Sequence, residues 1–216
     1  MPRSSRSAPG AQSRFGAVVM AAGEGRRFGG PKQLLEVGGV PLVCRAAAAA
    51  RAAGVEYVAV VTGAHAEAVT AAVEAWAAGL DEDASVEVVH NADWASGMRG
   101  SLREGVRAVV ARADPVACFV LLADQPAVDG ALLWSFAERL TAGAADAVAL
   151  AYPSGPGVPA LFSRKLYPRL MGEEEGYPAE GAKAVLRDAA VRTALVDAPA
   201  QRFDVDTPAD WETWRR

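Results

Sequence analysis

The chain has 216 residues, of which 51% are hydrophobic and 22% are charged, and this composition excludes a disordered or collagen-like protein. The formal charge of −4 argues against a protein that coats nucleic acid, and no apolar run reaches the roughly 20 residues that a membrane span requires. The cysteines, Cys44 and Cys118, lie in apolar surroundings, and we expect buried thiols in a reducing cytoplasm. The length predicts one domain over residues 15–216, after a leader over residues 1–14 that we expect to be disordered.

Short apolar runs alternate with stretches of helical periodicity along the chain, which is typical of an α/β domain with a mostly parallel sheet. Strands are predicted at residues 15–21, 56–62, 85–89, 116–122, 145–150 and 191–196. Helices are predicted at residues 41–53, 66–78, 100–111 and 129–140. A last helix is expected to begin near Thr207, which can serve as its N-cap, with Pro208 at the first helical position and Asp210 at the third.

Residues 21–32 follow the first predicted strand and form a loop of small and basic residues. The small ones are Ala21, Ala22, Gly23, Gly25, Gly29 and Gly30, and the basic ones are Arg26, Arg27 and Lys32. Small residues let backbone N–H groups approach phosphate oxygens closely, and cationic side chains strengthen the binding of the same anion. The dinucleotide fingerprint would need glycine where Phe28 stands, and a P-loop would need its lysine directly after the last glycine, where Pro31 stands. We therefore expect a polyphosphate site of another kind.

The string Met-Ala-Ala-Gly-x-Gly-x-Arg-Phe-Gly-x-Pro-Lys-x-Leu-Leu, residues 20–35, resembles the signature of the MobA-like NTP transferases, the molybdenum cofactor nucleotidyltransferases. The resemblance implies a three-layer Rossmann-like domain with a mostly parallel central sheet. It also implies that Arg27 and Lys32 hold the triphosphate, which leaves Arg26 the more expendable arginine. Alanine at position 22, where the guanylyl-transferring branch has glycine, implies that the nucleotide is CTP.

A second segment, residues 91–102, follows the third predicted strand and also resembles the family. Asn91, Gly97 and Ser101 match its Asn-x-x-Trp-x-x-Gly-Met-x-x-Ser-Leu pattern, which the resemblance places near the nucleotide. The Ser101 hydroxyl could contact the base or ribose, or it could cap the helix that follows. Trp94 is interpreted as a packing residue, and neither histidine is assigned to catalysis.

Three aspartates are candidates for a magnesium site. Asp124 ends a predicted buried strand, where an open α/β sheet binds its ligand, and it can bridge to a triphosphate through Mg²⁺; the alternative is a turn former before Gln125. Asp204 and Asp206 alternate along an extended segment, so both can face the same side. The family resemblance extends to both segments and implies that they line the site, but which of the two later aspartates assists Asp124 stays open.

The resemblance implies Mg²⁺-dependent transfer of CMP from CTP to a phosphorylated acceptor, with release of pyrophosphate. Molybdopterin is the leading acceptor, and a molybdoenzyme is the candidate recipient of the product. Two features depart from the family: Gly157-Val158-Pro159 replaces its Gly-His-Pro, and residues 172–182 form a longer and more acidic loop. The alternatives left open are transfer to a sugar, isoprenoid-precursor or hydroxy-acid phosphate, a nicotinamide dehydrogenase disfavoured by Phe28, and a non-catalytic partner in molybdoenzyme maturation.

Overall fold

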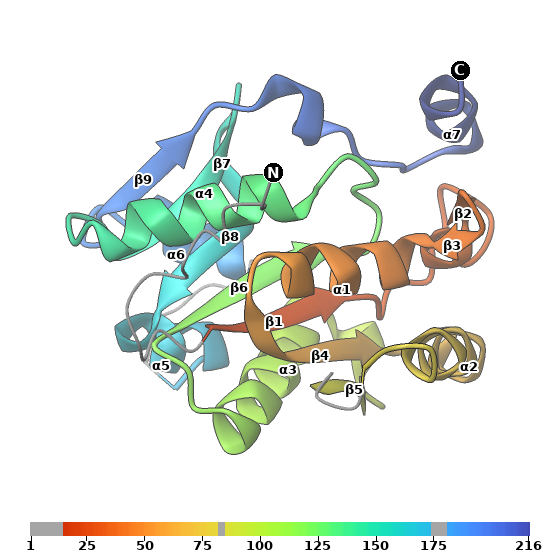
Figure 1. Cartoon of the computed structure of the whole chain (residues 1–216), viewed down its shortest axis with the longest axis horizontal. Coiled ribbons are helices and arrows are strands. Elements are labelled where there is room, and N and C mark those ends of the chain that lie inside the picture. Colours follow the sequence, from red (N-terminus) through yellow and green to blue (C-terminus); the bar gives the residue numbers. More distant parts are fainter. Residues whose placement is uncertain (1–14, 82–84, 174–180) are drawn as a thin grey trace, which may run out of the picture.

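A seven-stranded sheet runs through the centre of the molecule in the order β5-β4-β1-β6-β8-β7-β9 (Figure 1). The computed structural model describes residues 15–81, 85–173 and 181–216, so the expected leader and most of the acidic loop lie outside the described residues. The strands are β1 (Phe15–Met20), β4 (Val55–Thr62), β5 (Ser85–His90), β6 (Ala117–Leu122), β7 (Ala147–Tyr152), β8 (Gly155–Ser163) and β9 (Thr193–Val196). All six predicted strands are confirmed, with ends that differ by one or two residues.

The strand that the sequence pattern did not reveal is β8, which is antiparallel to its neighbours β6 and β7. Its first half contains Pro156 and Pro159, and proline cannot donate a ladder hydrogen bond. The pairing adapts to this: the register with β7 shifts between Ala149 and Leu150, and the pairing with β6 extends only as far as Ala160. The other pairs, β1 with β4 and β6, β4 with β5, and β7 with β9, are parallel, so the mostly parallel sheet is confirmed.

Helices cover both faces of the sheet and make three layers. The four long helices are those predicted: α1 (Leu42–Ala52), α2 (Ala66–Ala77), α3 (Met98–Arg112) and α4 (Gly130–Thr141). Two short helices, α5 (Tyr167–Met171) and α6 (Ala182–Arg187), were not predicted, because neither is long enough to show a helical period. One apolar cluster joins the sheet to α1, α2 and α4, and a second joins the opposite face to α3, α5 and α6.

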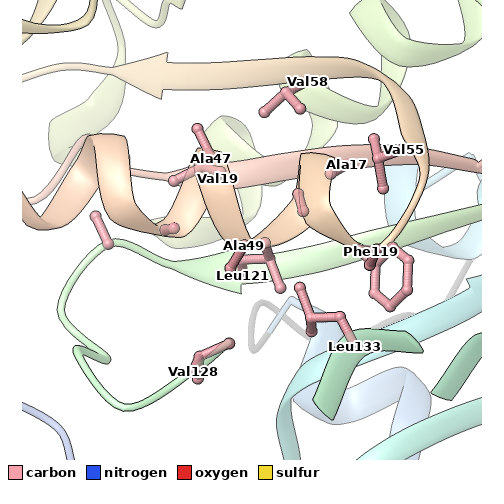
Figure 2. Packing of buried hydrophobic residues seen from close by; sticks show 14 of the residues in the cluster. Ala17, Val19, Ala47, Ala49, Val55, Val58, Phe119, Leu121, Val128 and Leu133 are labelled. Carbon is pink, nitrogen blue, oxygen red and sulfur yellow. The ribbon is translucent and has the colours of Figure 1, made fainter. Parts of the chain in front are cut away.

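The alternation of side chains along the central strands divides the core between the two faces. In β1, Ala17 and Val19 point to the first cluster, whereas Val18 points to the second. Figure 2 shows the first cluster, in which small residues of α1 and a leucine of α4 lie against β1, β4 and β6; labelled members include Ala47, Ala49, Leu133, Phe119 and Leu121. The alanine-rich sequence of α1 therefore serves close packing on the sheet.

Cys44 and Cys118 are free and buried, as expected. Burial raises the pKa of the Cys44 thiol to about 11, so it is a poor nucleophile at neutral pH. None of the helices in the described segments combines the length and apolar character needed to cross a membrane.

A buried carboxylate, Asp146, fastens the start of β7 to β9. It accepts hydrogen bonds from the backbone N–H and the guanidinium of Arg192, the closest at 2.7 Å, and it also pairs with Lys165. The Arg192 guanidinium bonds hold the pKa of the Asp146 carboxyl well below its usual range, although burial acts in the opposite direction. A depressed pKa means that folding favours the charged form, so this stabilisation is present above the ordinary carboxyl pKa of about 3.9 and is lost as the pH falls below it.

We expect Asp146→Asn to lower the free energy of unfolding at pH 7 by about 2 kcal/mol, because the exposed side chains of Arg192 and Lys165 lose a charged acceptor that is itself buried. Urea denaturation at pH 7 and at pH 3 measures the effect, which should shrink at the lower pH. Glu212→Gln is the control, since Glu212 pairs with Arg215 on the surface of the last helix and such pairs contribute little. Equal losses in the two variants would contradict the assignment.

Candidate nucleotide site

The loop over residues 21–32 lies at the carboxyl end of β1 and is folded around one glycine. The Gly25 carbonyl accepts hydrogen bonds from the N–H groups of Phe28, Gly29 and Gly30 at 2.9–3.3 Å. Gly25 has φ of 71°, and a Cβ there would lie 2.0 Å from the Gly30 oxygen, so only glycine fits. No backbone carbonyl of the described chain accepts from the N–H groups of residues 22–27. The loop therefore presents a row of unused backbone donors.

Two side chains outside the glycine pattern hold this loop in place. The buried Gln33 amide donates to the backbone oxygens of Ala21 and Gly23, each at 3.2 Å. His65, at the start of α2, places its Nε2 2.9 Å from the Glu24 carbonyl oxygen. Sequence analysis missed both roles, because a side chain that bonds to a distant backbone leaves no periodic signal.

The predicted charged residues meet beside the loop. The Lys32 ammonium lies 2.5 Å from Oδ2 of Asp124 and 2.8 Å from Oδ1 of Asp206. Arg27 places one guanidinium nitrogen 3.0 Å from the same Asp206 oxygen. Burial lowers the pKa of Lys32, but the two carboxylates outweigh it and hold that pKa above its ordinary value. Arg26 is turned away: its side chain is 84% exposed and bonds to Glu24.

Asp124 carries an oxygen without a partner. Oδ1 is buried and has no hydrogen-bond partner among the described residues. Asp124 lies two residues beyond the end of β6, and its backbone oxygen accepts a hydrogen bond of 2.9 Å from the N–H of Val205. Because Val205 stands between Asp204 and Asp206, this bond brings the C-terminal aspartates close to Asp124. A charged oxygen with no partner is costly unless a cation or donor meets it. Asp124 is thus more than a turn former.

Asp204 and Asp206 serve different partners. Asp206 joins Lys32 and Arg27, whereas Oδ1 of Asp204 accepts a hydrogen bond of 2.8 Å from the Gln125 amide. Burial raises the pKa of the Asp204 carboxyl; the bond from Gln125 opposes this, and the negative charge of Asp124 adds to it. Gln125 also donates toward Tyr152 and the Val158 carbonyl, at 2.9 and 3.1 Å. Neither Gln125 nor Tyr152 was recognised from sequence as a positioning residue.

A third apolar cluster fixes the C-terminal segment over the loop. The last helix, α7 (Pro208–Trp214), begins with a capping box between Thr207 and Asp210, which confirms the predicted start. Val205 and Trp211 pack with Leu42 of α1, and Phe28 of the glycine-rich loop lies against them. The burial of Val205 between the two aspartates therefore sets where their carboxylates lie.

The segment after β5 is held to helix α3 by side-chain hydrogen bonding. The buried Asn91 amide donates to the Ser101 hydroxyl at 2.9 Å, so the two side chains tie the strand end to α3. Helix α3 begins at Met98, with Gly97 at its N-cap, which places Ser101 in the second turn and excludes the capping role. Trp94 packs against the core cluster and against Gly63, as the packing interpretation predicted.

The donor set for a metal consists of carboxylates. Among the described residues, no group of three or more histidine, cysteine, aspartate or glutamate side chains is arranged as a metal site. Mg²⁺ and Mn²⁺ need no such group, because these hard cations bind one or two carboxylates together with phosphate and water oxygens. Asp124, with its unpartnered oxygen, and Asp206 fit this requirement.

A cavity of about 380 Å³ lies next to these charges, between the ends of β1 and β6, the turn from β7 to β8, and the starts of α3 and α6. Its walls are mainly apolar, with Met20, Met98, Leu122 and Val158 among them, and Asp204 and Lys183 are its charged residues. The cavity was not predicted from sequence, because it is assembled from segments that lie far apart in the chain.

Comparison with known proteins agrees with this arrangement. The family model described as MobA-like NTP transferase domain matches residues 17–197. None of the curated protein sequences matches the chain. Among solved structures, a nucleotidyl transferase from Methanothermobacter thermautotrophicus, Mth528, is 28% identical with a TM-score of 0.72, and the match covers 94% of this chain and 96% of that one.

Two mycobacterial structures are also similar. The homologue of Mycobacterium tuberculosis Rv0371c from Mycobacterium sp. strain JC1 is 26% identical with a TM-score of 0.72, covering 94% of this chain and 96% of that one. Rv0371c itself, in complex with manganese, is 25% identical with a TM-score of 0.66, covering 93% and 97%. With the fold, the family match and the loop geometry in agreement, the chain belongs to the MobA-like NTP transferase family and is a nucleotidyltransferase with a Rossmann-like fold.

Proposed function

We propose that this nucleotidyltransferase moves CMP from CTP to a phosphorylated acceptor in the cytoplasm, with molybdopterin as the acceptor and a molybdoenzyme as the recipient of the product. The observation that carries the transfer is the meeting of Lys32 and Arg27 with Asp124 and Asp206 beside a loop of unused N–H donors. CTP and molybdopterin are favoured by the resemblance of the glycine-rich segment to the cytidylyl-transferring branch.

The triphosphate would lie along the glycine-rich loop. The N–H groups of residues 22–27 can donate to phosphate oxygens, and Arg27 and Lys32 can exchange their carboxylate partners for phosphate. Asn91, Gly97 and Ser101 would support the nucleoside side of the site from the start of α3. These side chains hold the nucleotide in one orientation, which is the main catalytic contribution when no covalent enzyme intermediate forms.

The charges of the site support a divalent cation. Within the described segments, the ion pairs of Asp124 and Asp206 are with Lys32 and Arg27, and Asp204 lies close to them. These three aspartates and two cations carry one net negative charge, whereas the substrate is a polyanion. Asp124 and Asp206 would hold Mg²⁺, and the manganese complex of the related Rv0371c supports a divalent metal. When bound, the metal supplies positive charge to the reacting phosphate.

The transfer itself exchanges one phosphorus–oxygen bond for another. A phosphate oxygen of the acceptor attacks the α-phosphorus of CTP, the bond from that phosphorus to the bridging oxygen breaks, and pyrophosphate leaves. Arg27, Lys32 and the loop N–H groups would stabilise the charge that develops on the departing pyrophosphate.

Asp124→Asn is expected to lower kcat for pyrophosphate release by roughly 100-fold or more, because the amide keeps the volume but loses the charge toward the metal. The measurement is pyrophosphate release at saturating Mg²⁺ and Mn²⁺, with circular dichroism to confirm the fold. Asp81→Asn, at an exposed position far along the chain from the site residues, is the control. Full activity of the Asp124 variant would show that the metal assignment is wrong.

Two neighbouring arginines offer a matched pair. Arg27→Ala and Lys32→Ala should each lose about 2–4 kcal/mol of transition-state stabilisation, the scale for one aimed donor. Arg26→Ala should lose far less, because Arg26 bonds to Glu24 rather than to the carboxylates of the site. Values of kcat/KM for CTP test this contrast, and equal losses at the two arginines would refute it.

Base selectivity is expected to depend on Ala22, which is a buried residue of the loop. If its methyl group lies against the base, a purine with an exocyclic amino group has less room than a pyrimidine. We expect CTP to be preferred over GTP by roughly 10- to 200-fold in kcat/KM, and Ala22→Gly to reduce this ratio. A wild-type preference for GTP would refute the cytidylyl assignment and leave the transferase assignment intact.

A further inference from the structure

The residues that line the cavity beside the carboxylates restrict which ligands it can bind. Most of its surface is apolar, with Met20, Leu122 and Val158 among the lining residues. The donors of two polar side chains are already used: Tyr152 donates to the Val158 carbonyl at 2.7 Å, and the Gln125 amide nitrogen donates to Asp204. The Gln125 amide oxygen is buried without a partner among the described residues, so it can only accept. A polyol phosphate would leave many hydroxyl groups without partners in such a space, which is costly. A flat aromatic ring, whose two faces can pack against apolar walls, fits better.

Asp204 gives the cavity one anionic group of fixed position. The Gln125 amide holds its Oδ1 at 2.8 Å, and Val205, which follows it, is fully buried, so the backbone at this point is anchored. A carboxylate only accepts hydrogen bonds, so a ligand that meets it must present N–H or O–H groups. Lys183, on the rim, supplies the opposite charge.

We propose that the cavity binds the acceptor and that Asp204 is a specificity-determining residue, which recognises a hydrogen-bond-donating edge on a flat heteroaromatic ring. The anionic end of the acceptor would lie toward Lys183 or the triphosphate site. The role of the cavity as an acceptor site rests on the proposed function. It separates Asp204 from Asp206: the first faces the acceptor, and the second faces Lys32 and Arg27.

The experiment compares two ring systems that differ at one donor. Pterin carries an amino group where lumazine carries a carbonyl, so only pterin presents an amino donor there. Binding of each to the full chain is measured by the quenching of ligand fluorescence, without nucleotide. Wild type should bind pterin more tightly than lumazine, and Asp204→Asn should weaken pterin binding roughly 10-fold or more while changing lumazine binding little. Ribose 5-phosphate, a polyol phosphate, should not compete with pterin.

Two further variants make the result decisive. Met98→Trp enlarges a side chain that lines the cavity and is 64% exposed, so it should block both ligands without disturbing the core. Asp81→Asn should bind like wild type. The proposal is overturned if wild type does not bind pterin, if Asp204→Asn binds it equally well, or if ribose 5-phosphate displaces it. Pyrophosphate release from CTP is assayed separately, so failure of transfer with intact pterin binding counts against the proposed function alone.

Discussion

The ion pairs of Lys32 organise the whole edge of the sheet. Its ammonium group meets carboxylates from two elements that lie far apart in the chain, the end of β6 and the segment before α7. Asp124 and Asp206 would repel each other across a partly buried space if this positive charge were absent. The positive charge of one lysine therefore holds the two carboxylates together.

The remainder of the fold serves to bring these three groups together. Parallel pairing of β1 with β6 places the glycine-rich loop and Asp124 at the same edge of the sheet. The third apolar cluster then presses the C-terminal segment onto that edge, since Val205 and Trp211 are buried against Leu42. The side chains of Gln33 and His65 fix the loop through contacts with its backbone carbonyl oxygens, and they leave its N–H groups unused. Apolar packing and strand pairing thus determine where the charged side chains of the site lie.

The parts of the structure that sequence could predict are those with a local signal. Apolar runs and periodic stretches located six strands and the four long helices, and the capping residues located the start of α7. Strand β8 was not predicted, because Pro156 and Pro159 weaken its strand pattern in the sequence. It forms nevertheless, because it pairs with its neighbours in the sheet. The start of α3 was placed two residues late, because Gly97 caps it without a side chain.

Within the site, composition identified the charged groups but not their partners. Alternation could place Asp204 and Asp206 on one side of a strand, yet it could not tell that one meets Gln125 and the other Lys32. These two contacts depend on how the C-terminal segment lies across the edge of the sheet. The supporting roles of Gln33, His65 and Tyr152 depend in the same way on contacts between distant segments, which no local pattern records.

The contact between Lys32 and Asp206 joins positions separated by 174 residues, and this separation matters while the protein is being made. At roughly 5–20 residues per second, a ribosome needs on the order of ten seconds or more to reach the second partner after the first. During that interval the nascent chain already carries its glycine-rich loop and, later, Asp124, but it lacks the segment that closes over them. The ability to hold a nucleotide in its working orientation is therefore acquired only after the chain has been made as far as Asp206.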